Sequence, residues 1–295
     1  MATIIDKLSI FLIKWVASWS LTRMQRVGAL LGKFMFHLHL EPRHVTQVNL
    51  NICFPYMPER EKNGLVKMSL QNTGAVFLES AGIWHWPLDK SLDLVVDVEG
   101  EHFLQQAQAE GRGVLFLGPH LGNWELTGLY LSTRFKMASL YRPPKQPALE
   151  AFISHARGRA GAELVPTTTK GVARLLGILR KGGVVGILPD QVPPDNSSEI
   201  ASFFDHPAKT MTLVSRLVEK TSPVVLCAFA IRLPQAAGFK LIIQPAHDDI
   251  YSQDLTTSVT GLNKSVEDCV RRAPEQYQWE YKRFKGERPG FPRPY

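Results

Sequence analysis

Short apolar runs alternate with helix-like repeats along most of this chain. The run "VLFL" at 114–117 is fully apolar and bounded by glycines, as in a buried strand, whereas 124–131 has the apolar spacing of an amphipathic helix. Such patterns predict strands over 94–98, 114–117, 138–141, 184–188, 223–230 and 239–244. They predict helices over 4–40, 60–84, 101–110, 123–132, 147–160, 171–181, 210–220 and 255–273. The alternation favours an α/β fold with a mainly parallel central sheet flanked by helices.

The chain has no internal repeat, no low-complexity tract and no linker long enough to divide it into several domains. We therefore predict an N-terminal helical region over 1–40 that associates with a membrane, followed by one domain over 41–295.

The N-terminal region carries an amphipathic pattern. On a helical projection one apolar stripe contains Ile5, Leu8, Leu12, Trp15, Val16 and Trp19. Lys14 interrupts the run, which falls short of the roughly 18 uncharged apolar residues of a spanning helix. Tryptophans suit the headgroup level, and nearby lysines and arginines suit anionic lipid. We expect an interfacial anchor; a single membrane span and an ordinary core helix are the alternatives, and a cleaved signal peptide is disfavoured.

Composition limits the partners. The 295 residues are 44% hydrophobic and 21% charged, as in a globular protein, and the formal net charge is +7. A basic chain favours anionic partners such as anionic lipid or an acidic carrier protein. Nucleic acid is not expected, because the charge is dispersed and no nucleic-acid-binding module is present. The three cysteines are too dispersed for a zinc or disulfide framework, so we expect buried reduced thiols and no metal: Cys53, Cys227 and Cys269.

The best candidate for chemistry is the stretch "GPHLGNWE" at 118–125. His120 follows the predicted strand, Asn123 is placed as the N-cap of the next helix, and Glu125 lies in its opening turns. A carboxylate on one imidazole nitrogen supports the imidazolium that forms when the other nitrogen accepts a proton from a hydroxyl. His120 and Glu125 therefore fit a general base with an acidic partner. A capping histidine beside an acid that merely favours the helix N-terminus fits the same residues.

Two further strands end in polar groups. Arg142 follows one strand in "LYRPPK", and Asp190 follows another in "GILPDQ". In open α/β sheets, ligands gather beyond the carboxyl ends of the strands. We therefore expect His120, Arg142 and Asp190 to meet at one edge of the sheet.

Seven ordered blocks resemble the bacterial lipid A late acyltransferases, the lauroyl and myristoyl branch of the lysophospholipid acyltransferase-like proteins. The blocks cover nearly the whole chain: "NLNICFP" at 49–55, "GPHLGNWE" at 118–125, "YRPPKQP" at 141–147, "RGR" at 157–159, "GGVVGILPDQ" at 182–191, "FFDHPAKT" at 203–210 and "PEQYQWEYKRFK" at 274–285. One departure is that Tyr281 stands where many relatives have a histidine.

The resemblance implies a glycerol-3-phosphate acyltransferase-like fold and transfer of a fatty acyl chain from acyl carrier protein to a hydroxyl of a lipid A precursor. It places the reaction at the cytoplasmic face of the bacterial inner membrane, with acyl carrier protein as co-substrate and no cofactor. The family's histidine and acid correspond to His120 and Glu125, its arginine to Arg157 or Arg159, and its second acid to Asp190.

The residue types agree with that chemistry. A thioester is already activated, so the enzyme needs a base for the hydroxyl and donors for the developing oxyanion. Arg142, Arg157 and Arg159 are candidates for binding phosphate or carboxylate, and Asn123 is a further candidate for the substrate site. Whether Glu125 or Asp190 orients His120 stays open. Two other functions also remain: acyl transfer to another lipid or glycolipid, and non-catalytic binding of acyl carriers or glycolipids at a membrane surface.

Overall fold

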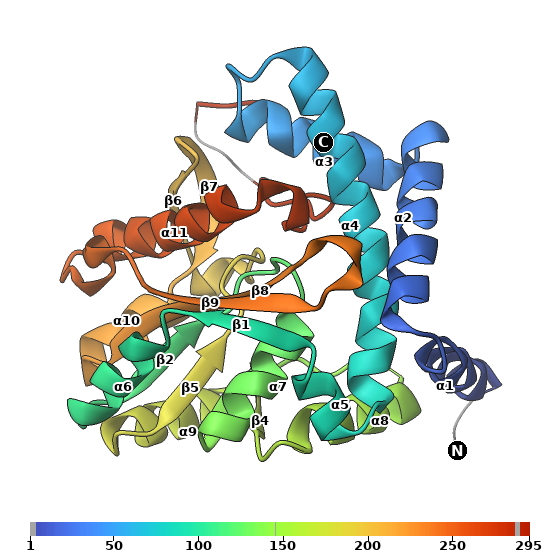
Figure 1. Ribbon diagram of the computed structural model, residues 1–295. Coiled ribbons are helices and arrows are strands. Elements are labelled where there is room, and N and C mark those ends of the chain that lie inside the picture. Colours follow the sequence, from blue (N-terminus) through green and yellow to red (C-terminus); the bar gives the residue numbers. More distant parts are fainter. Residues whose placement is uncertain (1–3, 145, 287–289) are drawn as a thin grey trace.

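A mainly parallel sheet forms the centre of the protein (Figure 1). The computed structural model describes residues 4–144, 146–286 and 290–295. Within these residues the sheet has seven strands in the order β1-β9-β8-β2-β5-β3-β4. Only the β8–β9 pair is antiparallel. The strands are β1 Val95–Glu99, β2 Val114–Leu117, β3 Met137–Tyr141, β4 Glu163–Pro166, β5 Val184–Ile187, β8 Val224–Arg232 and β9 Phe239–Pro245.

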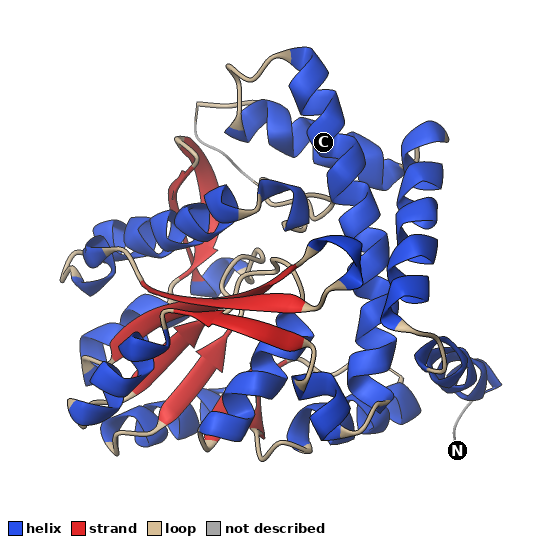
Figure 2. Cartoon of the chain, in the orientation of Figure 1, coloured by secondary structure: helices blue, strands red, loops and turns tan. Residues whose placement is uncertain are grey.

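Helices cover both faces of the sheet, and a separate hairpin packs beside them (Figure 2). The hairpin consists of β6 Ser198–Phe203 and β7 His206–Met211. The helices are α1 Ile4–Ala17, α2 Leu21–His37, α3 Glu41–Cys53, α4 Glu59–His85, α5 Leu88–Leu92, α6 Glu101–Ala109, α7 Trp124–Arg134, α8 Pro147–Gly158, α9 Thr169–Arg180, α10 Leu213–Thr221 and α11 Leu255–Arg272.

The predicted architecture is confirmed. All six predicted strands are present within two residues of their expected ends, and the helices after residue 59 lie within three. The predicted helical region over 4–40 is present as two helices, α1 and α2. They are separated where the Ser20 side chain accepts a hydrogen bond from the Arg23 amide and begins the second helix. The sequence did not predict α3, α5, β4, β6 and β7.

The central strands are buried on both sides because alternate side chains face opposite helical layers. In β2, Leu115 and Leu117 belong to the core cluster that contains residues of α9, α10 and α11, whereas Val114 and Phe116 belong to the cluster with α6 and α7. Two-sided burial explains why the strand reads as a continuous apolar run. It also leaves the ends of the strands as the place for polar chemistry.

The helix pair α2 and α4 packs through glycines along one flank of the molecule (Figure 1). A Cβ atom at Gly74 would lie 2.1 Å from the Gly28 carbonyl oxygen, and one at Gly28 would lie 2.5 Å from the Ala75 backbone. The two helices therefore approach closely, and α1 packs against α4 and α8 beside them.

The outward sides of α1 and α2 carry exposed large apolar side chains. We call this set the N-terminal apolar surface: Leu8, Phe11, Leu12, Trp15, Leu30, Leu31 and Phe34. On α1 the usual burial of a soluble protein's helix is inverted: the apolar Phe11 side chain is 64% exposed, whereas the acidic Asp6 is 2% exposed. No helix among the described residues has the length and apolar character needed to cross a membrane.

Candidate active site

The sheet order brings two of the predicted loops side by side. His120 follows β2 and Asp190 follows β5, and these two strands are parallel neighbours. Arg142 follows β3, which is the next strand beyond β5. The expected convergence at the carboxyl edge of the sheet is therefore confirmed for these three loops.

The His120 loop is held by its backbone. Gly122 adopts a left-handed conformation with φ +60°, and a Cβ atom there would lie 2.0 Å from the Ala230 carbonyl oxygen. The Gly122 amide donates to the Gln276 carbonyl at 3.0 Å, and the Asn123 amide donates to the Ala230 carbonyl at 2.8 Å. Only glycine fits this turn without strain, so the loop that presents His120 is fixed against β8.

Asp190 is the carboxylate that contacts His120. Its Oδ1 lies 2.7 Å from the imidazole Nδ1, and its Oδ2 accepts the His120 backbone amide at 2.8 Å. Burial alone would raise the pKa of Asp190, but the charge and hydrogen bonds of His120 outweigh it and lower this pKa. An ionised Asp190 accepts the hydrogen of Nδ1, which assigns the lone pair of the neutral ring to Nε2.

The second ring nitrogen of His120 faces polar and aromatic neighbours. Its Nε2 accepts a hydrogen bond from the Gln191 side-chain amide at 3.3 Å, and the Trp124 ring lies edge-on at 5.0 Å between centroids. The His120 side chain is 12% exposed. This nitrogen is thus the atom of the ring that a hydroxyl is able to approach.

Glu125 pairs with Arg157 instead of His120. The Arg157 Nε donates to Glu125 Oε2 at 2.9 Å, and its Nη2 donates to Oε1, which makes a bidentate pair between α7 and α8. Burial would raise the pKa of Glu125, but Arg157 lowers it below the ordinary value. The sequence alone leaves open whether Glu125 or Asp190 contacts the His120 imidazole. In the structure the contacting carboxylate is that of Asp190.

Asn123 is the N-cap of α7, as predicted, since its side-chain oxygen accepts the Leu126 amide at 3.0 Å. Its amide nitrogen donates to Glu79 at 3.1 Å, and Glu79 also forms a bidentate pair with Arg232, with both bonds at 2.6 Å. Asn123 is fully buried. The structure therefore assigns this residue to the scaffold of the loop and not to a surface that a substrate contacts.

The three candidate arginines lie in different surroundings. Arg157 is paired with Glu125, as described above. Arg159 donates to the Ser91 hydroxyl at 3.0 Å, and burial lowers its pKa. Arg142 is exposed at the start of the loop after β3. Of the three, Arg157 is the one joined to a residue of the His120 block.

The sequence reading missed the role of the segment 274–285 in the site. Arg283 of this segment is 3% exposed and donates to the Lys209 carbonyl at 2.6 Å and the Thr210 hydroxyl at 2.8 Å. The Gln278 amide donates to the His120 carbonyl at 3.0 Å. The ordered block "PEQYQWEYKRFK" was the signal that pointed to this segment.

Glu280, in the same segment, is a third carboxyl group near His120. Its Oε2 accepts the Thr73 hydroxyl at 2.9 Å. Burial raises the pKa of Glu280, while its hydrogen bonds and the charge of His120 act in the opposite direction. Nothing in the sequence separated this glutamate from a surface residue.

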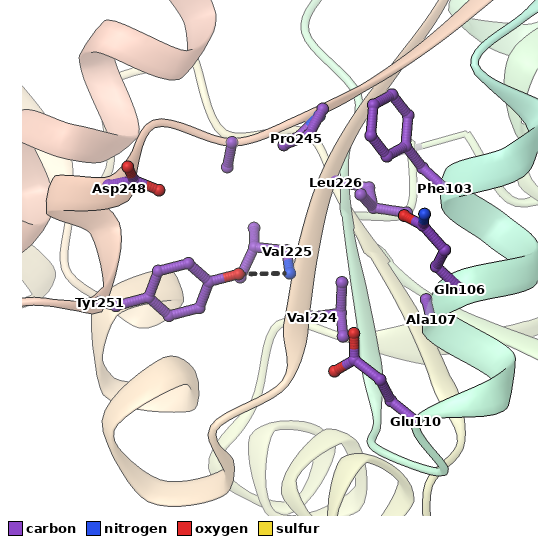
Figure 3. A pocket seen from close by; sticks show the side chains of 11 residues that line it. Phe103, Gln106, Ala107, Glu110, Val224, Val225, Leu226, Pro245, Asp248 and Tyr251 are labelled. Carbon is purple, nitrogen blue, oxygen red and sulfur yellow. Dashed lines mark hydrogen bonds between the residues drawn. The ribbon is translucent and has the colours of Figure 1, made fainter.

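A cavity of about 230 Å³ lies away from this site (Figure 3). It is lined by residues of α6, by Val224 and its neighbours at the amino end of β8, and by Tyr251, whose hydroxyl accepts the Val225 amide at 2.9 Å. None of the candidate site residues lines it. The three cysteines are buried thiols that form no disulfide with one another, as predicted.

Comparison with known proteins agrees with the order of the sequence blocks. The family model described as bacterial lipid A biosynthesis acyltransferase matches residues 2–286. The chain is 28% identical over 271 residues to a lipid A biosynthesis lauroyltransferase of Escherichia coli (strain K12), covering 92% of this chain and 88% of that one.

Two further relatives in Escherichia coli (strain K12) differ in the acyl chain that their names specify. A lipid A biosynthesis palmitoleoyltransferase is 28% identical over 88% of this chain and 83% of its own length. A lipid A biosynthesis myristoyltransferase is 26% identical over 90% of this chain and 82% of its own length.

Proposed function

Because the chain belongs to the bacterial lipid A biosynthesis acyltransferase family, we propose that it transfers a fatty acyl chain from acyl carrier protein to a hydroxyl of a lipid A precursor. The observation that carries this proposal is the contact between His120 and Asp190. An imidazole held at Nδ1 by a buried carboxylate, with the lone pair of Nε2 directed away from that carboxylate, is suited to accept a proton from a hydroxyl.

In the proposed reaction, His120 Nε2 accepts the proton of the acceptor hydroxyl while that oxygen attacks the thioester carbonyl. The ester C–O bond forms, the C–S bond breaks, and the imidazolium returns the proton to the leaving thiolate. Asp190 stabilises the imidazolium between these steps. No covalent acyl-enzyme and no cofactor are required, because the thioester is already activated.

We assign Glu125 and Arg157 to substrate positioning. The bidentate pair holds the guanidinium plane, and 34% of the Arg157 side chain is exposed. A guanidinium fixed in this way retains N–H groups for a phosphate or for the developing oxyanion. Arg142, exposed at the same edge of the sheet, is a second candidate for the anionic acceptor, and Arg159 is the weakest of the three because it lies against Ser91.

We further propose that the N-terminal apolar surface rests on the cytoplasmic face of the inner membrane. Its apolar side chains are flanked by exposed basic residues on the same helices: Lys7, Lys14, Arg23, Arg26 and Lys33. Apolar side chains that enter the headgroup region, combined with cations that face anionic lipid, are typical of interfacial helices. Such a position gives the enzyme direct access to a lipid acceptor, and the net charge of +7 favours an acidic carrier protein as donor.

The test is mass spectrometry of a tetra-acyl lipid A precursor incubated with acyl carrier protein charged with C10 to C16 chains. Wild type is expected to add one acyl mass, and His120→Ala is expected to lose about 10²- to 10⁴-fold of the rate, as for removal of a general base. His155→Ala, which changes an exposed histidine of α8, is the matched control and should keep the rate.

Other outcomes would replace the proposal. No added mass with any donor, together with acylation of another lipid, would indicate a different acceptor. Equal rates for wild type and His120→Ala would remove His120 from the mechanism. Binding of the carrier or glycolipid with no transfer at all would indicate a non-catalytic protein.

A further inference from the structure

A buried carboxylate of α4 lies beside the loop that carries His120. The Glu79 side chain is 1% exposed, and that of Arg232, at the end of β8, is 8% exposed. The guanidinium donates from Nε to Oε1 and from Nη2 to Oε2, each at 2.6 Å. A bidentate pair of this kind fixes the position and the plane of the carboxylate.

The side-chain groups that hydrogen-bond Glu79 in the described part of the chain are all donors. Besides Arg232, the Asn123 side-chain nitrogen donates to Oε2 at 3.1 Å, and the Gln25 side-chain nitrogen of α2 donates to Oε1 at 2.9 Å. An ionised carboxylate only accepts hydrogen bonds and has about four lone-pair sites. The four donors therefore match the accepting capacity of Glu79, and an amide at position 79 would place its own N–H groups against them.

This arrangement decides the orientation of the Asn123 side chain. Its nitrogen faces the accepting carboxylate, so its oxygen points the other way and accepts the Leu126 amide at 3.0 Å, which caps α7. The Asn123 backbone amide donates to the Ala230 carbonyl at 2.8 Å. Glu79 thus fixes the point at which the His120 loop ends and α7 begins.

Arg232 holds the same loop from a second side. Its backbone amide donates to the Gln276 side-chain oxygen at 2.8 Å, and its carbonyl accepts the Gln276 side-chain nitrogen at 3.1 Å. The Gln276 carbonyl in turn accepts the Gly122 amide at 3.0 Å. The pair of Glu79 and Arg232 is therefore linked by hydrogen bonds to two consecutive residues of the loop, Gly122 and Asn123.

We propose that Glu79 is a positioning residue, which orients the Asn123 cap and thereby sets the place of the His120 imidazole for acyl transfer. The inference rests on the proposed role of His120 as the base, and it adds a residue of α4 that acts through another side chain. A displacement of about 1 Å at a reacting group lowers a rate by up to about 10²-fold. A change at Glu79 should therefore affect the rate more than substrate binding.

The first test compares Glu79→Gln with Gln25→Ala. Glu79→Gln sets an amide nitrogen among the four donors, so Asn123 loses its fixed orientation. We expect kcat to fall about 10²-fold with little change in KM, and the Leu126 amide to exchange about tenfold faster in hydrogen-exchange NMR. Gln25→Ala removes a donor from the other oxygen of the same carboxylate and should leave both readouts near those of wild type.

The second test exchanges donor and acceptor between positions 79 and 123. Asn123→Asp alone sets two carboxylates against each other, so kcat should fall. The double variant Glu79→Gln, Asn123→Asp sets an amide at 79 against a carboxylate at 123 that still caps α7. Its kcat should exceed that of either single variant about tenfold, and Leu126 exchange should slow again. A role of Glu79 as a partner of Arg232 alone predicts no such recovery.

The outcomes separate this inference from the proposed function. Wild-type exchange of Leu126 in Glu79→Gln, or a double variant no better than Glu79→Gln, would overturn the inference. If Glu79→Gln alone does not fold, adding it to Asn123→Asp should still raise kcat, and a further fall would reject the contact. Recovery of slow exchange in the double variant of a protein that transfers no acyl chain would support loop positioning by Glu79 and reject the proposed function.

Discussion

At the residue scale, Asp190 and Glu125 are two buried acids with different partners. Asp190 holds the imidazole, and Glu125 holds Arg157. The two acids should therefore contribute to different kinetic parameters. Asp190→Asn keeps the shape of the side chain but removes the charge that stabilises the imidazolium, so we expect kcat to fall about 10²- to 10⁴-fold with little change in KM.

Glu125→Gln is the companion variant to Asp190→Asn. It leaves the His120 contact intact and loosens the guanidinium, so we expect a higher KM for the acceptor and a smaller fall in kcat. Steady-state kinetics with the lipid A precursor separates the two effects. The opposite result would be a fall in kcat of about 10²- to 10⁴-fold for Glu125→Gln with Asp190→Asn still active. Glu125 would then be the residue that orients His120.

The sequence predicted these residues but not their pairing. Glu125 lies five positions after His120, so proximity in the chain favoured it as the partner. Asp190 lies 70 positions away, and its contact depends on β2 and β5 being neighbours in the sheet. Strand order is a property of tertiary packing that apolar periodicity along one chain does not contain.

At the element scale, the glycines of α2 and α4 decide how closely these helices pack. A Cβ atom at Gly74 would lie 2.1 Å from the Gly28 carbonyl oxygen, whereas one at Gly64, on the same helix, would meet nothing within 4 Å. We expect Gly74→Ala to destabilise the protein by about 1–3 kcal/mol, as for overpacking. Gly64→Ala should stabilise it by about 0.5–1 kcal/mol, because alanine favours a helix.

Denaturant unfolding of the two glycine variants measures both changes in the free energy of unfolding. Equal stability of Gly74→Ala and wild type would show that α2 moves away from α4 without cost, and the close contact would then carry no stability. Loss of stability in Gly64→Ala would contradict the open space around that position.

Elements with two buried faces were the easiest to predict. β2 and β5 are short apolar runs because both of their faces are covered. The missed strands lack this pattern: β4 "ELVP" is an edge strand that ends in proline, and the β6–β7 hairpin carries polar side chains and Pro207. The break between α1 and α2 depends on the Ser20 N-cap, and the apolar repeat does not indicate this break.

At the scale of the whole molecule, the candidate active site is assembled by segments from both halves of the chain. His120, Asp190 and the 274–285 segment meet at one edge of the sheet, and Glu79 of α4 joins the cap of α7 to Arg232 at the end of β8. The helix that carries Glu79 also packs against α2. The N-terminal helices and the candidate active site thus share one scaffold. The orientation of the proposed membrane surface is therefore fixed relative to the His120 loop.

The proposed membrane surface leads to a prediction about the intact protein. Phe11 and Trp15 of α1 are 64% and 50% exposed, and partial burial of each in lipid contributes on the order of 1 kcal/mol or more. We expect the double variant Phe11→Ser and Trp15→Ser to bind phosphatidylglycerol-containing vesicles at least about 30-fold more weakly in co-sedimentation. Val96→Ser, which changes an exposed apolar residue on the edge strand β1, is the control and should bind as wild type does.

Added salt distinguishes the two forces in vesicle binding. Contacts of Lys7, Lys14, Arg23 and Arg26 with anionic lipid should weaken as salt is raised, while the apolar contribution of Phe11 and Trp15 should persist. The double variant should therefore show the stronger dependence on salt, because electrostatic attraction is most of what it retains. If the double variant and wild type bound equally at every salt concentration, or if Val96→Ser weakened binding as much, the lipid-facing surface would lie elsewhere on the protein.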